Sequence, residues 1–318
     1  MSRDTARMLD DYRMMLLIRR FEERVERLFA EGLIHGTTHL CIGQEAVPVG
    51  ISALLDRHDL TVSNHRGHGH FLARGADPSR LMAELLGRVT GYCKGKGGTQ
   101  HLSGLEVGHL GSNGITAGGL PVAAGAAFSL KRLRPGSVAV AYFGDGAMGE
   151  GVWHETMNIA SLWKLPLLFV CENNLYAMST PVKRGISGKS LAVRAAAYDM
   201  QWTVADGNDV EAVRAAAADL LEDVRAGRGP AFLEAQTYRF RGHSKSDARE
   251  YRTREEEEKW LAKCPIRRQE AKLAAAGVGE DELERVRREV EERIEEAARF
   301  ALDSDWPPVD EALRDLYA

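Results

Sequence analysis

Two polar clusters directly follow two of the most apolar runs of the chain, and their residue types are those of an ion-binding site. GDGAMGEG occupies residues 144–151 and ENNLYAMSTP occupies 172–181. Asp145 and Asn174 are 29 residues apart, about the length of one crossover between parallel strands. The two side chains should therefore leave neighbouring strand ends and lie side by side, at the edge where open α/β sheets bind their ligands.

The oxygen atoms of these clusters suit Mg²⁺. The Asp145 carboxylate, the Asn174 side-chain carbonyl and a nearby main-chain carbonyl are hard donors, and Mg²⁺ often shares such a shell with phosphate oxygens. Gly144 and Gly146 would let the backbone turn tightly and approach a diphosphate, while the start of the following helix offers free N–H groups. The sequence therefore predicts a site for a metal ion and a diphosphate.

A dinucleotide site is the alternative for the same segment. GDGAMG matches the G-x-G-x-x-G pattern, and Glu172 ends the next apolar run about where a ribose-binding acid would lie. However, a carboxylate at Asp145 would repel a pyrophosphate unless a cation lay between them. The pattern therefore favours a metal-bridged diphosphate, and the sequence contains no G-x-x-x-x-G-K-[ST] phosphate loop.

The surrounding pattern predicts the elements that position these clusters. Apolar β-type runs alternate with helical segments, which is typical of a mostly parallel, doubly wound α/β sheet. The expected strands are 138–143, 167–171, 202–205 and 231–236. The expected helices are 4–31, 121–131, 150–163 and 209–226. Residues 87–119 contain too many glycines for a stable helix or strand, so we expect a long loop that belongs to a site.

The end of the chain is charged and helical. Its apolar residues repeat at helical spacing and form one face, which consists of Leu283, Val286, Val290, Ile294, Ala298 and Leu302. We therefore expect two parts: an α/β domain with an N-terminal helical segment over residues 1–254, and a helical C-terminal extension over 255–318.

Composition excludes several classes of function. The 318 residues carry a formal charge of −4, so no general basic field attracts nucleic acid or anionic lipid. The first 20 residues lack the apolar stretch of a secretory signal, and no apolar run is long enough to span a membrane. The four cysteines are widely separated, which disfavours a disulfide framework. We expect a cytoplasmic protein with no nucleic-acid or membrane partner.

The sequence closely resembles the alpha subunit of the decarboxylating component of 2-oxo acid dehydrogenase complexes, a group that includes pyruvate and acetoin dehydrogenases. GDG followed after about 27 residues by NN is similar to the thiamine diphosphate fingerprint. The likeness continues in HLCIGQEAV, SNHRGHGH, GYCKGKGGTQH, GSNGI and YRFRGHSKSD. It therefore covers most of the chain.

The resemblance implies roles for individual residues. By motif, the Mg²⁺ ligands are Asp145, Asn174 and the main-chain carbonyl of Tyr176. Gly144, Gly146 and Ala147 match diphosphate contacts, and His65 with Arg66 falls where the family places a pair that reaches the diphosphate. Gly114 to Thr116 matches the segment along the aminopyrimidine ring, with Gly114 and Thr116 as contacts. His39 and His243 match histidines near the reactive thiazolium carbon, where imidazole can move protons near neutral pH.

Two features leave alternatives open. A zinc site formed by His65, His68 and His70 competes with the diphosphate interpretation, although the permanent charge of Arg66 opposes metal binding. The loop with Arg239, His243 and Ser244 resembles a mobile active-site loop that carries a regulatory phosphoserine in some relatives. Here Arg241 replaces the usual histidine, so phosphorylation at Ser244 does not follow from the resemblance.

The resemblance also implies cofactors and partners. Thiamine diphosphate and Mg²⁺ would be the cofactors, and the glutamate that activates the aminopyrimidine would come from a beta subunit in an α2β2 assembly. The expected reaction cleaves acetoin or pyruvate and passes the acetyl unit to a lipoyl group on an acyltransferase. A branched-chain 2-oxo acid dehydrogenase, a nicotinamide-dependent dehydrogenase and a non-catalytic regulatory subunit are the alternatives. His65, where pyruvate enzymes often have tyrosine, is similar to acetoin-type members.

Overall fold

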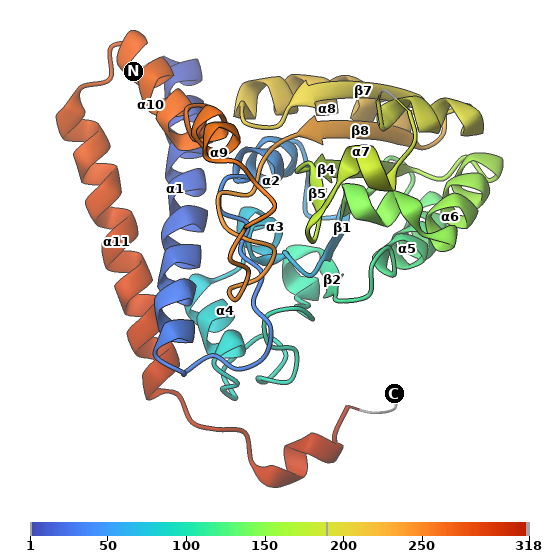
Figure 1. The fold of residues 1–318 in the computed structure, drawn as a ribbon. Helices are drawn as coiled ribbons and strands as arrows, with labels where there is room; N and C mark the ends of the chain where they lie inside the picture. Colours follow the sequence, from blue (N-terminus) through green and yellow to red (C-terminus); the bar gives the residue numbers. More distant parts are fainter. Residues whose placement is uncertain (1, 189, 316–318) are drawn as a thin grey trace.

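The computed structural model describes residues 2–188 and 190–315, and a six-stranded sheet lies at its centre (Figure 1). Its order is β2-β1-β3-β4-β8-β7, and every neighbouring pair is parallel. The strands are β1 (Leu60–Asn64), β2 (His109–Asn113), β3 (Ala139–Gly144), β4 (Leu167–Asn173), β7 (Gln201–Asp206) and β8 (Ala231–Gln236). The expected α/β class is therefore confirmed.

The central strands are apolar on both faces because helices cover both. In β3, Ala141 and Phe143 pack on one side, whereas Val140 and Tyr142 pack on the other. Helices α5 (Gly119–Leu133) and α6 (Gly151–Leu162) cover the first face, and α2 (Ala46–Ser52) and α8 (Val210–Arg225) cover the second. This double cover explains the continuous apolar runs in the sequence.

A second core joins the two ends of the chain. Helix α1 (Arg3–Ala30) packs against α10 (Pro265–Ala275) and α11 (Glu280–Asp303), and Figure 1 shows α1 and α11 running side by side, away from the sheet. The remaining helices are α3 (His68–Ala73), α4 (Pro78–Leu85), α7 (Val182–Gly185) and α9 (Arg254–Leu261). The proposed division at residue 254 stays a prediction.

Three details differ from the sequence-based expectation. The glycine-rich segment 87–119 is not entirely loop, because it contains strand β2, and β1 was not anticipated either. Strand β2 lies at the sheet edge and pairs only with β1, so main-chain hydrogen bonds form it without an apolar pattern. On α11, Leu302 is exposed, while Ala297 and Ala301 complete the buried face instead.

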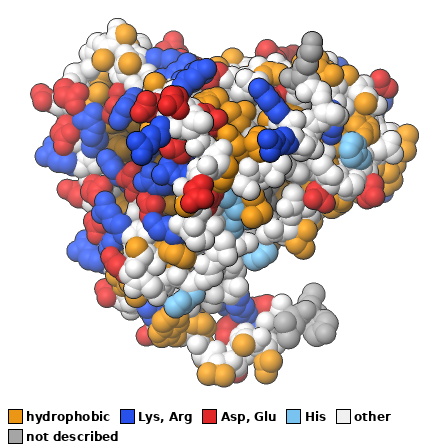
Figure 2. Space-filling model, in the orientation of Figure 1, with side chains coloured by type: hydrophobic (Ala, Val, Ile, Leu, Met, Phe, Trp, Pro, Cys, Tyr) orange, Lys and Arg blue, Asp and Glu red, His pale blue; other side chains and the backbone are white. Residues whose placement is uncertain are grey.

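The surface agrees with the composition. Figure 2 shows basic and acidic side chains mixed over α1 and α11, with no continuous basic face in this view. Within residues 2–188 and 190–315, no helix combines the length and the apolar character needed to cross a membrane.

The packing of α11 predicts a stability difference between two positions on the same helix. Ile294 is buried in the core shared with α1, whereas Leu302 is exposed. Ile294→Ala should lower the free energy of unfolding by about 2–5 kcal/mol, because it leaves a cavity. Leu302→Ala is the matched control and should change it by less than about 1 kcal/mol. Urea denaturation measures both, and equal effects would contradict this packing.

Candidate active site

The loops that follow β1, β2, β3, β4 and β8 meet at the carboxyl edge of the sheet around a cavity of about 270 Å³. Most of the residues singled out in the sequence line it: His65, Arg66, Thr116, Gly144, Asp145, Gly146, Ala147, Asn174, Tyr176 and His243. Gly114 and His39 do not line it directly, although the His39 ring contacts that of His65. Ligands of doubly wound sheets bind at this edge.

The register of β3 and β4 brings the two polar clusters together. Gly144 pairs with Glu172, so Asp145 and Asn174 leave adjacent strands at nearly the same level. A Cβ atom at Gly146 would lie 2.7 Å from the Cβ of Ala177, so only glycine lets these two loops approach each other this closely. Gly146 therefore permits close packing between the two loops, and its approach to a diphosphate stays a prediction.

Asp145 is a buried carboxylate with an unused oxygen. Its side chain is 1% exposed, and Oδ2 has no hydrogen-bond partner among the described residues. Burial raises its pKa from 3.8 to about 6, although Arg239 and Arg66 act in the opposite direction. A cation bound beside Oδ2 would favour the charged form, so this orphaned oxygen fits a metal ligand.

Two further oxygen atoms lie in the adjacent loop. Oδ1 of Asn174 accepts only a long hydrogen bond of 3.4 Å from the Tyr176 N–H, and the Tyr176 carbonyl accepts from Nη2 of Arg239 at 3.2 Å. Both oxygens keep a lone pair that is free for a second partner. A carboxylate, an amide oxygen and a main-chain carbonyl form a donor set that suits Mg²⁺.

Two buried guanidinium groups give the site its positive charge. Arg66 donates to the carbonyls of Leu40 at 2.7 Å and His243 at 3.2 Å, and Arg239 donates to those of Tyr176 and Met178. Within the described part of the chain, neither forms an ion pair with a carboxylate, and Nε and Nη1 of Arg239 have no partner. Burial lowers the pKa of Arg66 to about 9, and Arg239 adds to that effect. Buried cations of this kind call for an anionic ligand.

Arg239 lies in the motif YRFRGHSKSD, but the sequence pattern does not predict it as a site residue. The sequence does not reveal its position because Arg239 follows the end of β8 at Gln236 and reaches the Tyr176 carbonyl through irregular backbone. Gln44, Asn64, Ala177 and Met178 also line the cavity without having been selected. The motifs HLCIGQEAV and ENNLYAMSTP contain three of these four residues, so the signal was present there.

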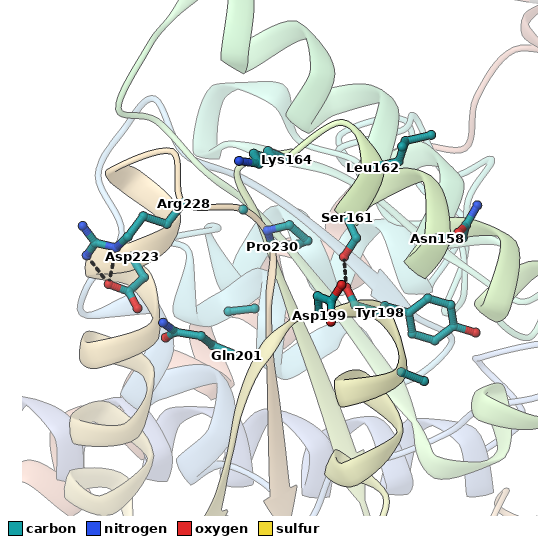
Figure 3. Close-up of a pocket in the computed structure, with 13 residues that line it drawn as sticks. Asn158, Ser161, Leu162, Lys164, Tyr198, Asp199, Gln201, Asp223, Arg228 and Pro230 are labelled. Atoms are coloured by element: carbon teal, nitrogen blue, oxygen red, sulfur yellow. Dashed lines mark hydrogen bonds and ion pairs between the residues drawn. The ribbon is translucent and has the colours of Figure 1, made fainter.

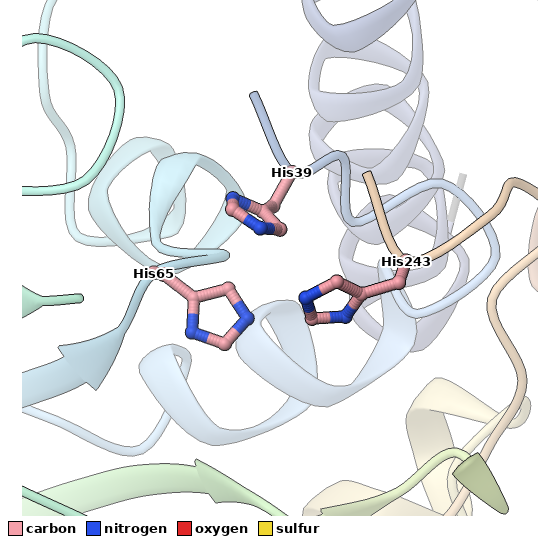
Figure 4. Close-up of side chains that lie close together, drawn as sticks. All are labelled: His39, His65 and His243. Atoms are coloured by element: carbon pink, nitrogen blue, oxygen red, sulfur yellow. The ribbon is translucent and has the colours of Figure 1, made fainter. Parts of the chain in front are cut away.

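Three histidines from distant loops form a cluster beside the cavity (Figure 4). The ring centroids of His39 and His65 are 4.4 Å apart, those of His39 and His243 are 4.8 Å apart, and those of His65 and His243 are 5.5 Å apart. Burial, followed by the charge of Arg66, lowers their pKa values to about 3 for His39, about 2 for His65 and about 4 for His243. At neutral pH the rings are therefore uncharged, and their nitrogen lone pairs are free.

The alternative zinc set does not assemble. Nδ1 of His68 contacts Glu22 at 2.9 Å, and Nε2 of His70 contacts Glu172 at 3.1 Å, so both rings are buried in separate pairs. The same contact ties Glu172 to His70, which removes the free acid that a dinucleotide ribose would need.

The glycine-rich segment folds around the carboxylate of Glu84. This side chain is fully buried and accepts four main-chain hydrogen bonds, from the N–H groups of Cys93, Gly95, Gly97 and Gly98. The segment then reaches the site: the Gln100 amide binds the carbonyl of Thr37, two residues before His39, and its Oε1 lies 2.6 Å from a Cβ position at Gly114. Glu84 thus helps to position two segments beside the cavity, the one that carries His39 and the one that carries Gly114.

The loop that carries His243 is tied to its surroundings by charge. Arg241 and Lys245 pair with Glu26 of α1, each at 3.1 Å. Asp247 accepts from the His243 N–H at 2.6 Å and from the Tyr251 hydroxyl at 2.6 Å. The arginine that replaces the usual histidine at 241 therefore fixes this loop to α1.

A second cavity, of about 400 Å³, lies at the opposite edge of the sheet, where β7 and β8 begin (Figure 3). Two contacts join polar groups in its lining: Ser161 donates to the Tyr198 carbonyl at 2.6 Å, and Arg228 pairs with Asp223. The buried groups Asp145, Arg66 and Arg239, which form no ion pair with any described residue, lie instead at the carboxyl edge.

Fold and cavity together define an α/β protein with buried charges of both signs, unpaired within the described part of the chain, at the carboxyl ends of parallel strands. Residues 12–310 match the family model described as dehydrogenase E1 component. The chain belongs to this family of oxidoreductases, which confirms the resemblance found in the sequence.

Relatives with known functions align over nearly the whole chain. The alpha subunit of acetoin:2,6-dichlorophenolindophenol oxidoreductase from Bacillus subtilis is 42% identical over 96% of this chain and 92% of its own length. The pyruvate dehydrogenase E1 component subunit alpha of Zymomonas mobilis is 44% identical over 97% of this chain and 88% of its own. The acetoin protein of Cupriavidus necator is 40% identical over 99% and 95%.

The burial of the Asp145 carboxylate predicts that this side chain lowers the stability of the ligand-free protein at neutral pH. Between pH about 4 and 6 the native protein holds a proton on Asp145 that the unfolded chain has released, so this group lowers stability as pH rises through that window. Without ligands, Asp145→Asn should raise the free energy of unfolding at pH 7 by about 1–3 kcal/mol and leave it unchanged near pH 4. Denaturant titrations at both pH values test this, and destabilisation at pH 7 would contradict it.

The role of Glu84 predicts a loss of order in one segment. Glu84→Ala removes the acceptor of four main-chain N–H groups, so the free energy of unfolding should fall by about 2–4 kcal/mol. Hydrogen exchange should rise over residues 91–101. Glu106→Ala, which removes an exposed carboxylate near this segment, is the control and should have little effect. Unchanged exchange in Glu84→Ala would show that the loop folds without the carboxylate.

Proposed function

We propose that this chain is an alpha subunit that binds thiamine diphosphate through Mg²⁺ and, with a beta subunit, cleaves acetoin or pyruvate. The observation that carries the proposal is the orphaned carboxylate oxygen of Asp145 beside two buried, unpaired guanidinium groups. When bound, thiamine diphosphate would supply a thiazolium ring that stabilises negative charge on the former carbonyl carbon of the substrate.

The residues of the β3 and β4 loops would hold the charged end of the cofactor. Asp145, Asn174 and the Tyr176 carbonyl would ligate Mg²⁺, and the main-chain N–H groups of Gly146 and Ala147 would face the diphosphate with Gly144 beside them. Arg66 would supply donors matched to phosphate oxygens. The anion would offset the repulsion between the two guanidinium groups, and the cation would offset the cost of burying Asp145.

The other residues would handle the reactive end. Gly114 and Thr116, after β2, would lie along the aminopyrimidine through main-chain groups. His39 and His243 would exchange protons with the substrate, and their lowered pKa values leave both rings uncharged at neutral pH. His65, which lines the cavity and whose ring contacts those of His39 and His243, would contact the diphosphate side.

A beta subunit would complete the site. The names of the matched relatives describe alpha subunits. Ile115 and Met178, at the edge of the cavity, are 72% and 64% exposed, which suits a surface that another protein covers. We propose an α2β2 assembly, a lipoyl-bearing acyltransferase as acceptor of the acetyl unit, and a cytoplasmic location. The branched-chain alternative is not favoured, because the relatives quoted above act on acetoin or pyruvate by name.

Calorimetry of the chain co-purified with its partner subunit tests the cofactor proposal. Thiamine diphosphate with Mg²⁺ should bind, and Asp145→Ala should weaken binding at least about 100-fold, because it removes a charged ligand. Asp281→Ala, an exposed acid on α11, is the control. Unchanged affinity in Asp145→Ala, or binding of a nicotinamide dinucleotide without metal, would contradict the proposal.

Substrate choice needs a separate measurement. The reconstituted complex should reduce an artificial electron acceptor with acetoin or pyruvate and not with branched 2-oxo acids. A comparison of kcat/KM across the three substrates identifies the preferred one. Preference for a branched 2-oxo acid would overturn the assignment while leaving cofactor binding intact.

A further inference from the structure

We propose that His39, His65 and His243 also form a binding site for one transition-metal ion of the Zn²⁺ class, separate from the proposed Mg²⁺ site. The nearest ring nitrogens of the three histidines all lie within 4.8 Å of one another. Three imidazoles with an open fourth position are the donor set of many catalytic zinc sites. Figure 4 shows the three rings converging on a common space from three separate segments of the chain.

The geometry requires only small side-chain movements. Zn²⁺ binds imidazole nitrogen at about 2.0–2.1 Å, which places the nitrogens of a tetrahedral site roughly 3.4 Å apart. Closing the cluster from its present spacing therefore needs a displacement of about 1 Å or less at each ring nitrogen. His65 and His243 line the cavity, so the open coordination position faces the space where a small ligand or water enters.

The three rings also have nitrogen lone pairs that are free to bind a metal ion. Nδ1 of His39 is buried without a partner, and among the described residues no hydrogen bond engages the ring of His65 or His243. The other buried histidines differ in part: His68, His70 and His109 each have at least one ring nitrogen in a hydrogen bond, although Nδ1 of His70 and Nε2 of His109 also lack a partner among the described residues. Unengaged imidazole nitrogens inside a protein are rare, and a metal ion would satisfy all three at once.

Chemistry separates this site from the one at Asp145. Imidazole favours Zn²⁺, Co²⁺ or Cu²⁺, whereas a carboxylate with amide and main-chain oxygens favours Mg²⁺. The guanidinium of Arg66 lies beside the cluster and repels a dication, so we expect binding weaker than at structural zinc sites. The ion would therefore bind reversibly and would not be a permanent structural metal.

If the proposed function holds, a metal ion bound at the three histidines would inhibit turnover. A metal ion bound to His39 and His243 would occupy the lone pairs that proton transfer requires. Zn²⁺ should then inhibit turnover without displacing Mg²⁺ from Asp145. Metal binding itself is measured without turnover, so failure of the proposed function and failure of this inference are distinguishable.

Co²⁺ is a suitable probe because its four-coordinate complexes absorb visible light far more strongly than its six-coordinate ones. The full chain, co-purified with its partner subunit and stripped of metal and cofactor, is titrated with Co²⁺ and then with Zn²⁺. We expect intense visible bands that saturate at one ion per chain and disappear when Zn²⁺ replaces Co²⁺. His65→Asn and His243→Asn should each weaken Co²⁺ binding at least about tenfold and abolish the intense bands.

His35→Gln is the matched control, because His35 is exposed and lies outside the cluster, and it should behave like the wild type. Circular dichroism verifies folding of each variant, and either folded variant of the pair suffices for the test. Weak, six-coordinate absorption in the wild type, or intense bands that survive in both His65→Asn and His243→Asn, would overturn the inference.

Discussion

The rest of the site depends on an electrostatic imbalance at the carboxyl edge of the sheet. Asp145, Arg66 and Arg239 are all nearly or fully buried. Among the described residues, the two guanidinium groups donate only to main-chain carbonyls, and one oxygen of Asp145 has no partner. Desolvation dominates the pKa shifts of all three groups. A cation beside Asp145 and an anion between the arginines would remove this cost, which is why a metal diphosphate fits.

Buried carboxylates fix the segments that surround the cavity. Glu22 with His68 and Glu172 with His70 form buried pairs, and both glutamates favour the charged form of Arg66. Glu84 folds the glycine-rich segment that buttresses the β2 end, and Glu26 fixes the loop that carries His243. Internal carboxylates therefore hold the shape, while the carboxylate of Asp145 is left for a ligand.

Much of this could be predicted from the sequence because the polar clusters directly follow apolar runs. Strand ends are local features, and the parallel register of β3 and β4 then places Asp145 next to Asn174. The sites of Arg239 and Glu84 could not be found in this way, since their contacts lie 63 and about 10 residues away along irregular backbone. Strand β2 was missed because an edge strand needs no apolar pattern, and the three-histidine cluster because its members come from three separate loops.

The most direct measurement of the central claim is a crystal of the complex grown with thiamine diphosphate and with Mn²⁺ in place of Mg²⁺, examined by anomalous scattering. The account predicts one strong peak per alpha chain, within coordination distance of the Asp145 carboxylate, the Asn174 side-chain oxygen and two diphosphate oxygens. A cofactor bound with its diphosphate elsewhere, or a metal peak that neither side chain touches, would contradict it.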